Sequence, residues 1–274
     1  DEVRKEAITG IDLVKKAGIQ TVMITGDNKE TAISIGKEVG LIKNNNDLVL
    51  TSDELKTKSD DEIKKINDEL KDKNEKLEEA YLSTIQTLRY TVEAKDTYTR
   101  GHSDRVSQYS VLIGKHLGLS DSDLHDLEVG GLFHDIGKIG IPDSILRKES
   151  RLTDDEYSEI KNHPAIGAHI LSSAKIFANI IPIVKHHHER YDGNGYPGRL
   201  KGEDIPYFAR IAAIADTFDA MTSKRSYRDS LPLDVVIAEF KRCRGTQFDP
   251  ELDDVFLDIL ENHYDEIQKI MDNY

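Results

Sequence analysis

The chain has 274 residues, with 37 Lys and Arg against 51 Asp and Glu, so its formal net charge is −14 at pH 7. Such an acidic surface repels phosphates, and we expect no nucleic-acid partner. The single cysteine, Cys243, excludes an internal disulfide and favours a reducing, cytoplasmic compartment. No apolar run approaches the roughly 20 residues that a membrane-spanning helix needs, so we expect no membrane segment in this chain. No signal peptide opens the chain, and its start at Asp1 indicates a fragment or a processed product.

Residues 1–50 have the pattern of a partial α/β fragment. An apolar helix face ends near Gly18, and the run TVMI at 21–24 predicts a short buried strand. Asp27 or Asn28 then suits the cap of a second helix. One strand with two helices cannot close a sheet, so the rest of this core is missing.

Residues 51–90 form a charged stretch without glycine. Its apolar residues recur at three-, four- and seven-residue spacings, which predicts a long amphipathic linker helix. One interpretation is half of a two-helix coiled coil, which would make the chain a homodimer. Lys73 and Asn74 interrupt that seam. The alternative is a lone solvated helix that packs on the next domain.

Residues 91–274 are predicted to be almost entirely helical and to form the main domain. Gly- and Pro-containing loops separate the helical patterns, and the longest loops are 139–152 and 189–205. The helical patterns cover 103–117, 122–137, 153–173, 176–188, 206–221, 232–243 and 250–272.

Several of the ten histidines lie beside acids or at predicted helix ends. Asp216 is the only acid in the apolar run IAAIAD. A lone carboxylate or imidazole is costly to bury, whereas a shared metal centre would satisfy all of these groups. Nitrogen and oxygen donors without sulfur favour octahedral iron or manganese over structural zinc, with two ions bridged by Asp135. The alternatives are satisfied core histidines, a surface run at 186–188 and an internal cap at Asp216.

Six motifs occur in an order that resembles the HD-GYP family, a branch of the HD metal-dependent phosphohydrolases. The resemblance covers residues 91–270, about two thirds of the chain. The motifs are YTRGHS (98–103), HDIGKIGIP (134–142), KNHP (161–164), HHERYDGNGYP (187–197), ADTFDAMT (215–222) and GTQFDP (245–250).

The resemblance implies an all-helical bundle that hydrolyses cyclic di-GMP to pGpG or GMP; some members act on related cyclic dinucleotides. It implies two divalent metal ions, with iron or manganese as the expected identity. Tyr98 occupies the position where a trinuclear subclass has glutamate, so we expect a dinuclear site. The implied metal ligands are His102, His134, Asp135, His163, His187, His188 and Asp216.

The resemblance also assigns residues to the substrate. Lys138 would lie beside the scissile phosphate. The charge chemistry of the reaction adds the hypothesis that Lys138 or Asp96 protonates the leaving ribose oxygen; Asp96 is equally suited to hydrogen-bond a ligand histidine. Arg225 and Arg228 would hold phosphate oxygens, although they also suit an ordinary solvated helix end. The loop Gly195, Tyr196 and Pro197 would shape the nucleotide pocket or offer a partner surface, and its alternative role is turn geometry alone.

Residues 1–66 resemble part of the HAD-like phosphorylation domain of P-type cation ATPases. The segments that match are AGI (17–19), MITGDN (23–28) and TA (31–32). The phosphorylated aspartate of that family and its later acidic motif are missing, so this segment is not expected to pump ions. A gene fusion and a chimera made during sequence assembly would both explain the join.

The sequence motifs leave three candidate functions. The full set of expected ligands favours a metal-dependent cyclic di-GMP phosphodiesterase. The second is a catalytically weak module that binds a cyclic dinucleotide or a GGDEF-domain partner. The third, a cation-transport ATPase fragment, is opposed by the missing nucleophile and membrane spans.

Overall fold

The computed structural model describes residues 29–38, 60–95, 101–148, 150–223 and 230–273. The chain divides into two compact units, 1–80 and 81–274. In the first unit, α2 (Lys29–Glu38) lies where the sequence predicts the second helix. The predicted strand at 21–24 and the caps Asp27 and Asn28 lie outside the described residues. Among the helices of the described part, none is long and apolar enough to cross a membrane.

The predicted linker helix is α4 (Asp60–Lys95), which continues past residue 90. Its last turns, from Tyr81 on, are part of the second unit, where Ile85 is only 3% exposed and joins an apolar cluster. Tyr81 and Leu88, four residues before Ile85 and three after it, border the same cluster. This spacing places all three on one helix face. Dimerisation through α4 stays a prediction.

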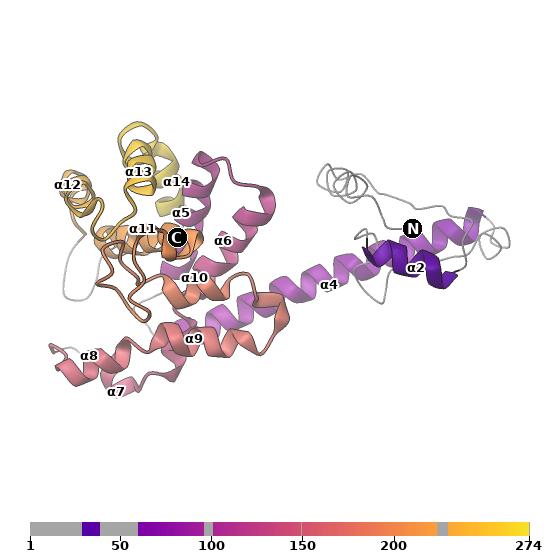
Figure 1. The fold of residues 1–274 in the computed structure, drawn as a ribbon, viewed down its shortest axis with the longest axis horizontal. Helices are drawn as coiled ribbons and strands as arrows, with labels where there is room; N and C mark the ends of the chain where they lie inside the picture. The colour runs from indigo at the N-terminus through magenta and orange to yellow at the C-terminus, as the bar shows by residue number, and fades with distance from the viewer. Residues whose placement is uncertain (1–28, 39–59, 96–100, 149, 224–229, 274) are drawn as a thin grey trace. The chain divides into compact units, whose positions relative to one another are not determined.

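The second unit is a helical bundle, and its described residues contain no strand (Figure 1). α11 packs against α5, α10, α12 and α13, while α9 packs against α10 and η2. In chain order the elements after α4 are α5 (His102–His116), α6 (Asp121–Phe133), the 3-10 helix η2 (Ile136–Gly140), α7 (Asp143–Leu146), α8 (Asp154–Ile160), α9 (His163–Ser172), η3 (Lys175–Phe177), α10 (Ile181–His186), η4 (Gly202–Asp204), α11 (Tyr207–Thr222), α12 (Leu233–Cys243), α13 (Pro250–Asn262) and α14 (Tyr264–Asn273).

Several predicted helices are broken in two, and the breaks have local causes. α6 ends at Phe133 because Asp135 leaves the helical region, with φ −98° and ψ 6°. Pro164, in the first turn of α9, has no backbone N–H and disfavours a continuous helix from α8. Gly137 lets η2 approach α9, since a Cβ there would lie 1.8 Å from the carbonyl oxygen of His163. The breaks therefore bring polar side chains to helix ends that face one another.

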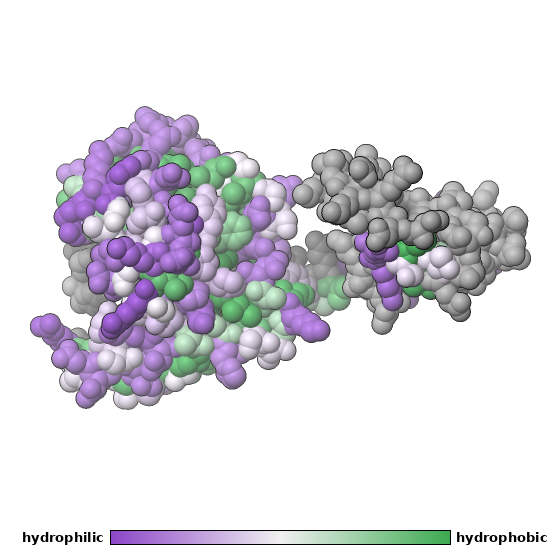
Figure 2. Space-filling model, in the orientation of Figure 1, coloured by the Kyte–Doolittle hydropathy of each residue, from purple (hydrophilic) through white to green (hydrophobic). Residues whose placement is uncertain are grey.

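Two apolar clusters form the core, and α11 contributes to both. One side of α11 supplies Ile214 and Phe218 to the larger cluster, while Ala212 belongs to the smaller one. Phe218 packs edge-on against Tyr109 and Phe256. The face shown in Figure 2 is mainly hydrophilic over this unit, with smaller hydrophobic patches. This is the pattern of a bundle whose large apolar side chains point inward.

One buried acid makes the stability of the bundle depend on pH. Asp253 is fully buried, and neither carboxylate oxygen has a hydrogen-bond partner. Burial, with the charge of Asp254, raises the pKa of Asp253 to about 7. Because the folded-state pKa is raised, the contribution of Asp253 to stability is greatest below about pH 4, falls as pH rises toward 7 and stays lower above it.

We expect Asp253→Asn to be more stable than the parent at pH 8, by about 2 kcal/mol, because the variant buries no charge. The gain should shrink toward pH 4. Thermal unfolding measured across this range checks the expectation. Asp234→Asn, at an exposed acid in the first turn of α12, is the matched control and should show no such pH-dependent gain. A gain of equal size at pH 4 and pH 8 would contradict the assignment.

Candidate metal centre

The ends of four helices and the middle of α11 converge on one site. His102 begins α5, and His163 begins α9. His134 and Asp135 link α6 to η2, and His187 caps the C-terminus of α10. The structure brings together all seven predicted ligands: His102, His134, Asp135, His163, His187, His188 and Asp216.

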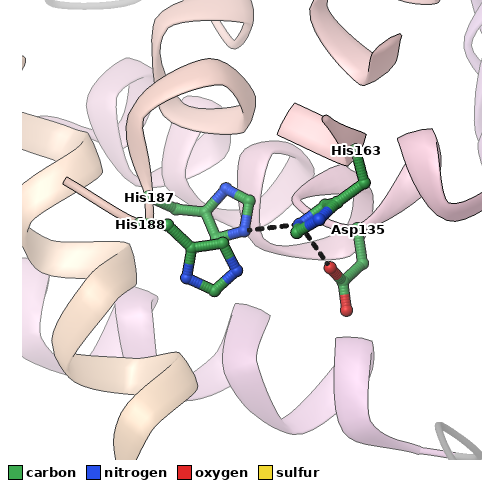
Figure 3. Close-up of side chains that lie close together, drawn as sticks. All are labelled: Asp135, His163, His187 and His188. Atoms are coloured by element: carbon green, nitrogen blue, oxygen red, sulfur yellow. Dashed lines mark hydrogen bonds and ion pairs between the residues drawn. The ribbon is translucent and has the colours of Figure 1, made fainter. Parts of the chain in front are cut away.

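Four of these residues form the first group of potential metal ligands. Figure 3 shows the ring of His163 between His187 and Asp135. His163 Nε2 lies 3.2 Å from Asp135 Oδ1 and 3.4 Å from His187 Nε2. His188 completes the group, and one donor atom from each residue lies within 4.8 Å of the others.

His102, His134 and Asp216 form the second group. Asp216 Oδ1 lies 3.4 Å from His102 Nε2 and 4.0 Å from His134 Nε2. Asp135 joins the two groups because its other oxygen, Oδ2, lies 3.4 Å from His134 Nε2 and 3.9 Å from His102 Nε2. One carboxylate thus offers one oxygen to each group, as the bridging prediction for Asp135 requires.

Backbone carbonyls orient three of the histidines. Nδ1 of each donates to the carbonyl oxygen three residues earlier, at 2.7 to 2.9 Å; the pairs are His134 with Gly131, His163 with Ile160, and His187 with Val184. Because a carbonyl oxygen only accepts, Nδ1 carries the proton and Nε2 keeps its lone pair. All three lone pairs are therefore presented to the centre, which is the arrangement found in metal-ligating histidines.

Asp219 orients the fourth histidine, and the sequence predictions give it no role. His102 Nδ1 donates to Asp219 Oδ2 at 2.7 Å. Arg105 holds the same carboxylate through two hydrogen bonds of 2.6 and 3.0 Å, and Ser223 donates to it at 3.1 Å. A usable signal was the three-residue spacing between Asp216 and Asp219, which places both acids on one face of a helix.

We expect Asp219→Asn to weaken metal retention by about 10- to 100-fold, since the variant no longer fixes the protonated nitrogen of His102. Chelator competition followed by metal analysis measures the change, with circular dichroism to confirm folding. Ser223→Ala removes a contact of Asp219 and leaves His102 bonded, so it serves as the control. Unchanged metal retention in a folded Asp219→Asn protein would contradict an orienting role.

Electrostatics favour a cation in this site. Burial alone would lower the pKa of His102, but hydrogen bonds and charges from Asp216 and Asp219 raise it to about 9. Burial likewise disfavours ionised Asp135, yet Lys138 and the nearby histidines bring its pKa well below the usual range. Burial and the neighbouring histidines keep the pKa of His187 low, so this ring is neutral, the form that binds metal.

Two observations test whether the residues fit metal ions. The buried Nε2 of His134 has no hydrogen-bond partner. The Nε2 atoms of His163 and His187 face each other at 3.4 Å, although both rings carry their proton on Nδ1. Buried lone pairs without a donor are unfavourable, and a cation bound near them would remove this cost. The donor set fits divalent metal ions.

The predicted substrate residues are placed only in part. Lys138 lies at the site, with Nζ 2.6 Å from Asp135 Oδ2. The Tyr196 ring lies 4.8 Å from that of His188. Gly195 lets two backbone segments pack closely, because a Cβ there would lie 2.3 Å from the backbone nitrogen of Arg190. Asp96, Tyr98, Arg225 and Arg228 lie outside the described residues.

Glu189 holds the loop that carries Tyr196 and Pro197, and this role is also absent from the sequence predictions. It is 3% exposed and accepts hydrogen bonds from the backbone N–H groups of Gly198, at 2.6 Å, and Leu200, at 3.0 Å. The loop is therefore tied to the residue that directly follows the adjacent ligands His187 and His188.

Comparison with known proteins identifies the family of this chain. The family model described as HD domain matches residues 86–252, more than half of the chain. The chain belongs to the HD domain family.

Curated relatives include the cyclic di-GMP phosphodiesterase response regulator RpfG of Xanthomonas campestris, 41% identical over 182 residues, covering 66% of this chain and 48% of the relative. A cyclic di-GMP phosphodiesterase of Thermotoga maritima is 38% identical over 66% of this chain and 50% of the relative. The 3'3'-cGAMP-specific phosphodiesterase 3 of Vibrio cholerae is 38% identical over 64% and 38%. The chain thus spans half or less of the length of these relatives.

Two solved structures share the fold. One is a cyclic GMP-AMP specific phosphodiesterase of Vibrio cholerae, with TM-score 0.50, 22% identity, and coverage of 69% of this chain and 52% of that one. The other is the HDG"Y"P protein Bd1817 of Bdellovibrio bacteriovorus, with TM-score 0.50, 20% identity and 65% coverage of each chain. Both support the all-helical fold.

Proposed function

We propose that the chain is an HD-GYP phosphodiesterase that hydrolyses cyclic di-GMP to pGpG or GMP. The main support is the pair of buried donor groups joined by Asp135. The relatives named cyclic di-GMP phosphodiesterases, at 41% and 38% identity, point to the same substrate. The naming triplet Gly195, Tyr196 and Pro197 also favours this branch of the HD family.

Iron or manganese is the metal that the donor set favours. The two groups offer imidazole nitrogens and carboxylate oxygens without a thiolate, and such sets suit these ions. Two divalent ions bound here would neutralise the phosphodiester and lower the pKa of the attacking water. The chain's own part is to hold donors of both groups in place through Asp135 and the oriented histidines.

The substrate would enter where the site is open to solvent. The side chains of His188, Lys138 and Asp216 are 27%, 18% and 18% exposed. Those of His102, His134, Asp135 and His163 are at most 9% exposed. A phosphodiester arriving at this opening would meet the Lys138 ammonium beside the donor groups. We assign Lys138 to bind a phosphate oxygen and to donate a proton to the leaving ribose 3′-oxygen.

The remaining substrate roles rest on the sequence. Arg225 and Arg228 are proposed to bind the phosphates, and Asp96 is the second candidate for the proton donor. A GGDEF-domain partner and a homodimer through α4 are further proposals of the same kind. For residues 1–66 we propose an ATPase-like fragment without pump activity, so ATP should give no acid-stable phosphoenzyme.

Incubation with cyclic di-GMP tests the function directly. The chain is reconstituted with iron or manganese, its metal content is measured, and the products are resolved by chromatography and mass spectrometry. We expect pGpG or GMP, with 3'3'-cGAMP as a parallel substrate because one relative is specific for it. Stoichiometric metal without hydrolysis of either dinucleotide would favour the binding module instead.

A further inference from the structure

A second cluster of metal-ligand type lies away from the candidate centre. It consists of His116, the last residue of α5; His263, which joins α13 to α14; and Glu266 in the first turn of α14. One donor atom from each lies within 4.8 Å of the others. Three segments of the fold therefore meet at two imidazoles and one carboxylate.

The spacing of the donor atoms is close to what a tetrahedral ion needs. Ligands bound to zinc at about 2.0–2.1 Å lie about 3.3 Å apart at tetrahedral angles. Glu266 Oε1 lies 3.3 Å from His116 Nε2 and 3.7 Å from His263 Nδ1. Side-chain shifts of a few tenths of an ångström would bring both distances to the zinc value.

A second carboxylate lies near the other nitrogen of His263. Nε2 of this ring lies 4.0 Å from Asp258 Oδ2, and Asp258 is itself held by Asn262 at 2.7 Å. This places a carboxylate behind the imidazole and leaves Nδ1 toward Glu266. At 4.0 Å the two are too far apart for a hydrogen bond, so Asp258 acts on this imidazole through its charge.

The cluster is separate from the phosphodiesterase centre. His102 and His116 are the first and last residues of the 15-residue helix α5. At a rise of 1.5 Å per residue they lie about 21 Å apart along the helix. The cluster is also accessible to an ion, since the side chains of His116, Glu266 and His263 are 21%, 40% and 45% exposed.

We propose that His116, His263 and Glu266 form a site for a divalent transition ion of the zinc class, with water as a fourth ligand. Two histidines and a glutamate are a known zinc donor set. The ion would join the C-terminal end of α5 to the start of α14. Its effect is on the stability of the C-terminal helices, because a ligand that binds only the folded chain stabilises it.

Zinc titration of the full chain tests the proposal. The chain is first loaded with manganese, and bound zinc is then counted by metal analysis in parallel with the melting temperature. We expect His263→Ala and Glu266→Gln each to bind one equivalent of zinc less than the parent and to lose the zinc-dependent rise in melting temperature. His169→Ala, at an exposed histidine outside both clusters, is the matched control and should behave as the parent.

The absorption spectrum of bound cobalt distinguishes this site from the candidate metal centre. Four-coordinate cobalt absorbs visible light much more strongly than six-coordinate cobalt, so the strong bands should disappear in both variants. Cyclic-dinucleotide hydrolysis should stay unchanged, which separates this proposal from the proposed function. Equal zinc stoichiometry and equal cobalt bands in the parent and Glu266→Gln would overturn the site.

Discussion

Asp135→Asn is expected to lose metal from both donor groups at once and to lower hydrolysis of cyclic di-GMP by about a thousandfold or more. Asp135 faces both groups closely through different oxygens, at 3.2 Å from His163 and 3.4 Å from His134. Asp216 reaches the first group only at 4.0 Å, through its Oδ2 and His188. The amide has no negative charge to hold two cations. A loss in hydrolysis rate of this size corresponds to the loss of several kcal/mol of the transition-state stabilisation that bound metal ions would supply.

Two single-group variants make the test specific. His187→Ala removes a donor from the first group alone, and His102→Ala removes one from the second group. Each should deplete about one ion, whereas Asp135→Asn should deplete two. Metal analysis after equilibrium dialysis, alongside product analysis, distinguishes these patterns. Retention of both ions by a folded Asp135→Asn protein would rule out a bridging role.

The convergence of the candidate metal ligands was predictable from the sequence because their chemistry is unusual in its context. Adjacent pairs such as His134 with Asp135, and an acid such as Asp216 inside an apolar run, are costly unless they share a partner. Residue patterns alone left core histidines and an internal cap as alternatives. The order of the motifs that resemble the HD-GYP family indicated which of these residues belong to one site, and the structure brings them together.

The breaks within the helices were harder to predict, since periodicity continues across them. The apolar pattern at 122–137 shows neither that the chain leaves the α-helix at Asp135 nor that Gly137 packs closely on α9. Buried partners were also missed. Asp219 and Glu189 act on groups distant in sequence or on backbone N–H groups. The spacing from Asp216 places Asp219 on the same helix face, but no residue pattern identifies His102 as its partner.

Lys138→Met is expected to reduce turnover by about 100- to 1,000-fold while the metal content stays at the parental level. Lys138 is partly exposed at the opening of the site, where its ammonium would stabilise charge that develops on the phosphate and leaving oxygen. Methionine keeps most of the length and the apolar character of the lysine stem but removes the charge and the proton. The loss should fall mainly on kcat, with a smaller change in KM, if the ammonium acts most strongly in the transition state.

The ion pair with Asp135 makes metal content the deciding measurement. Lys138 Nζ lies 2.6 Å from Asp135 Oδ2 and helps to lower the pKa of that carboxyl. If its role were only to keep Asp135 ionised, Lys138→Met would lose metal together with activity. Lys185→Met, at an exposed lysine on α10, should keep both. A variant that retains its metal and loses turnover assigns Lys138 to the substrate, whereas full turnover removes it from the mechanism.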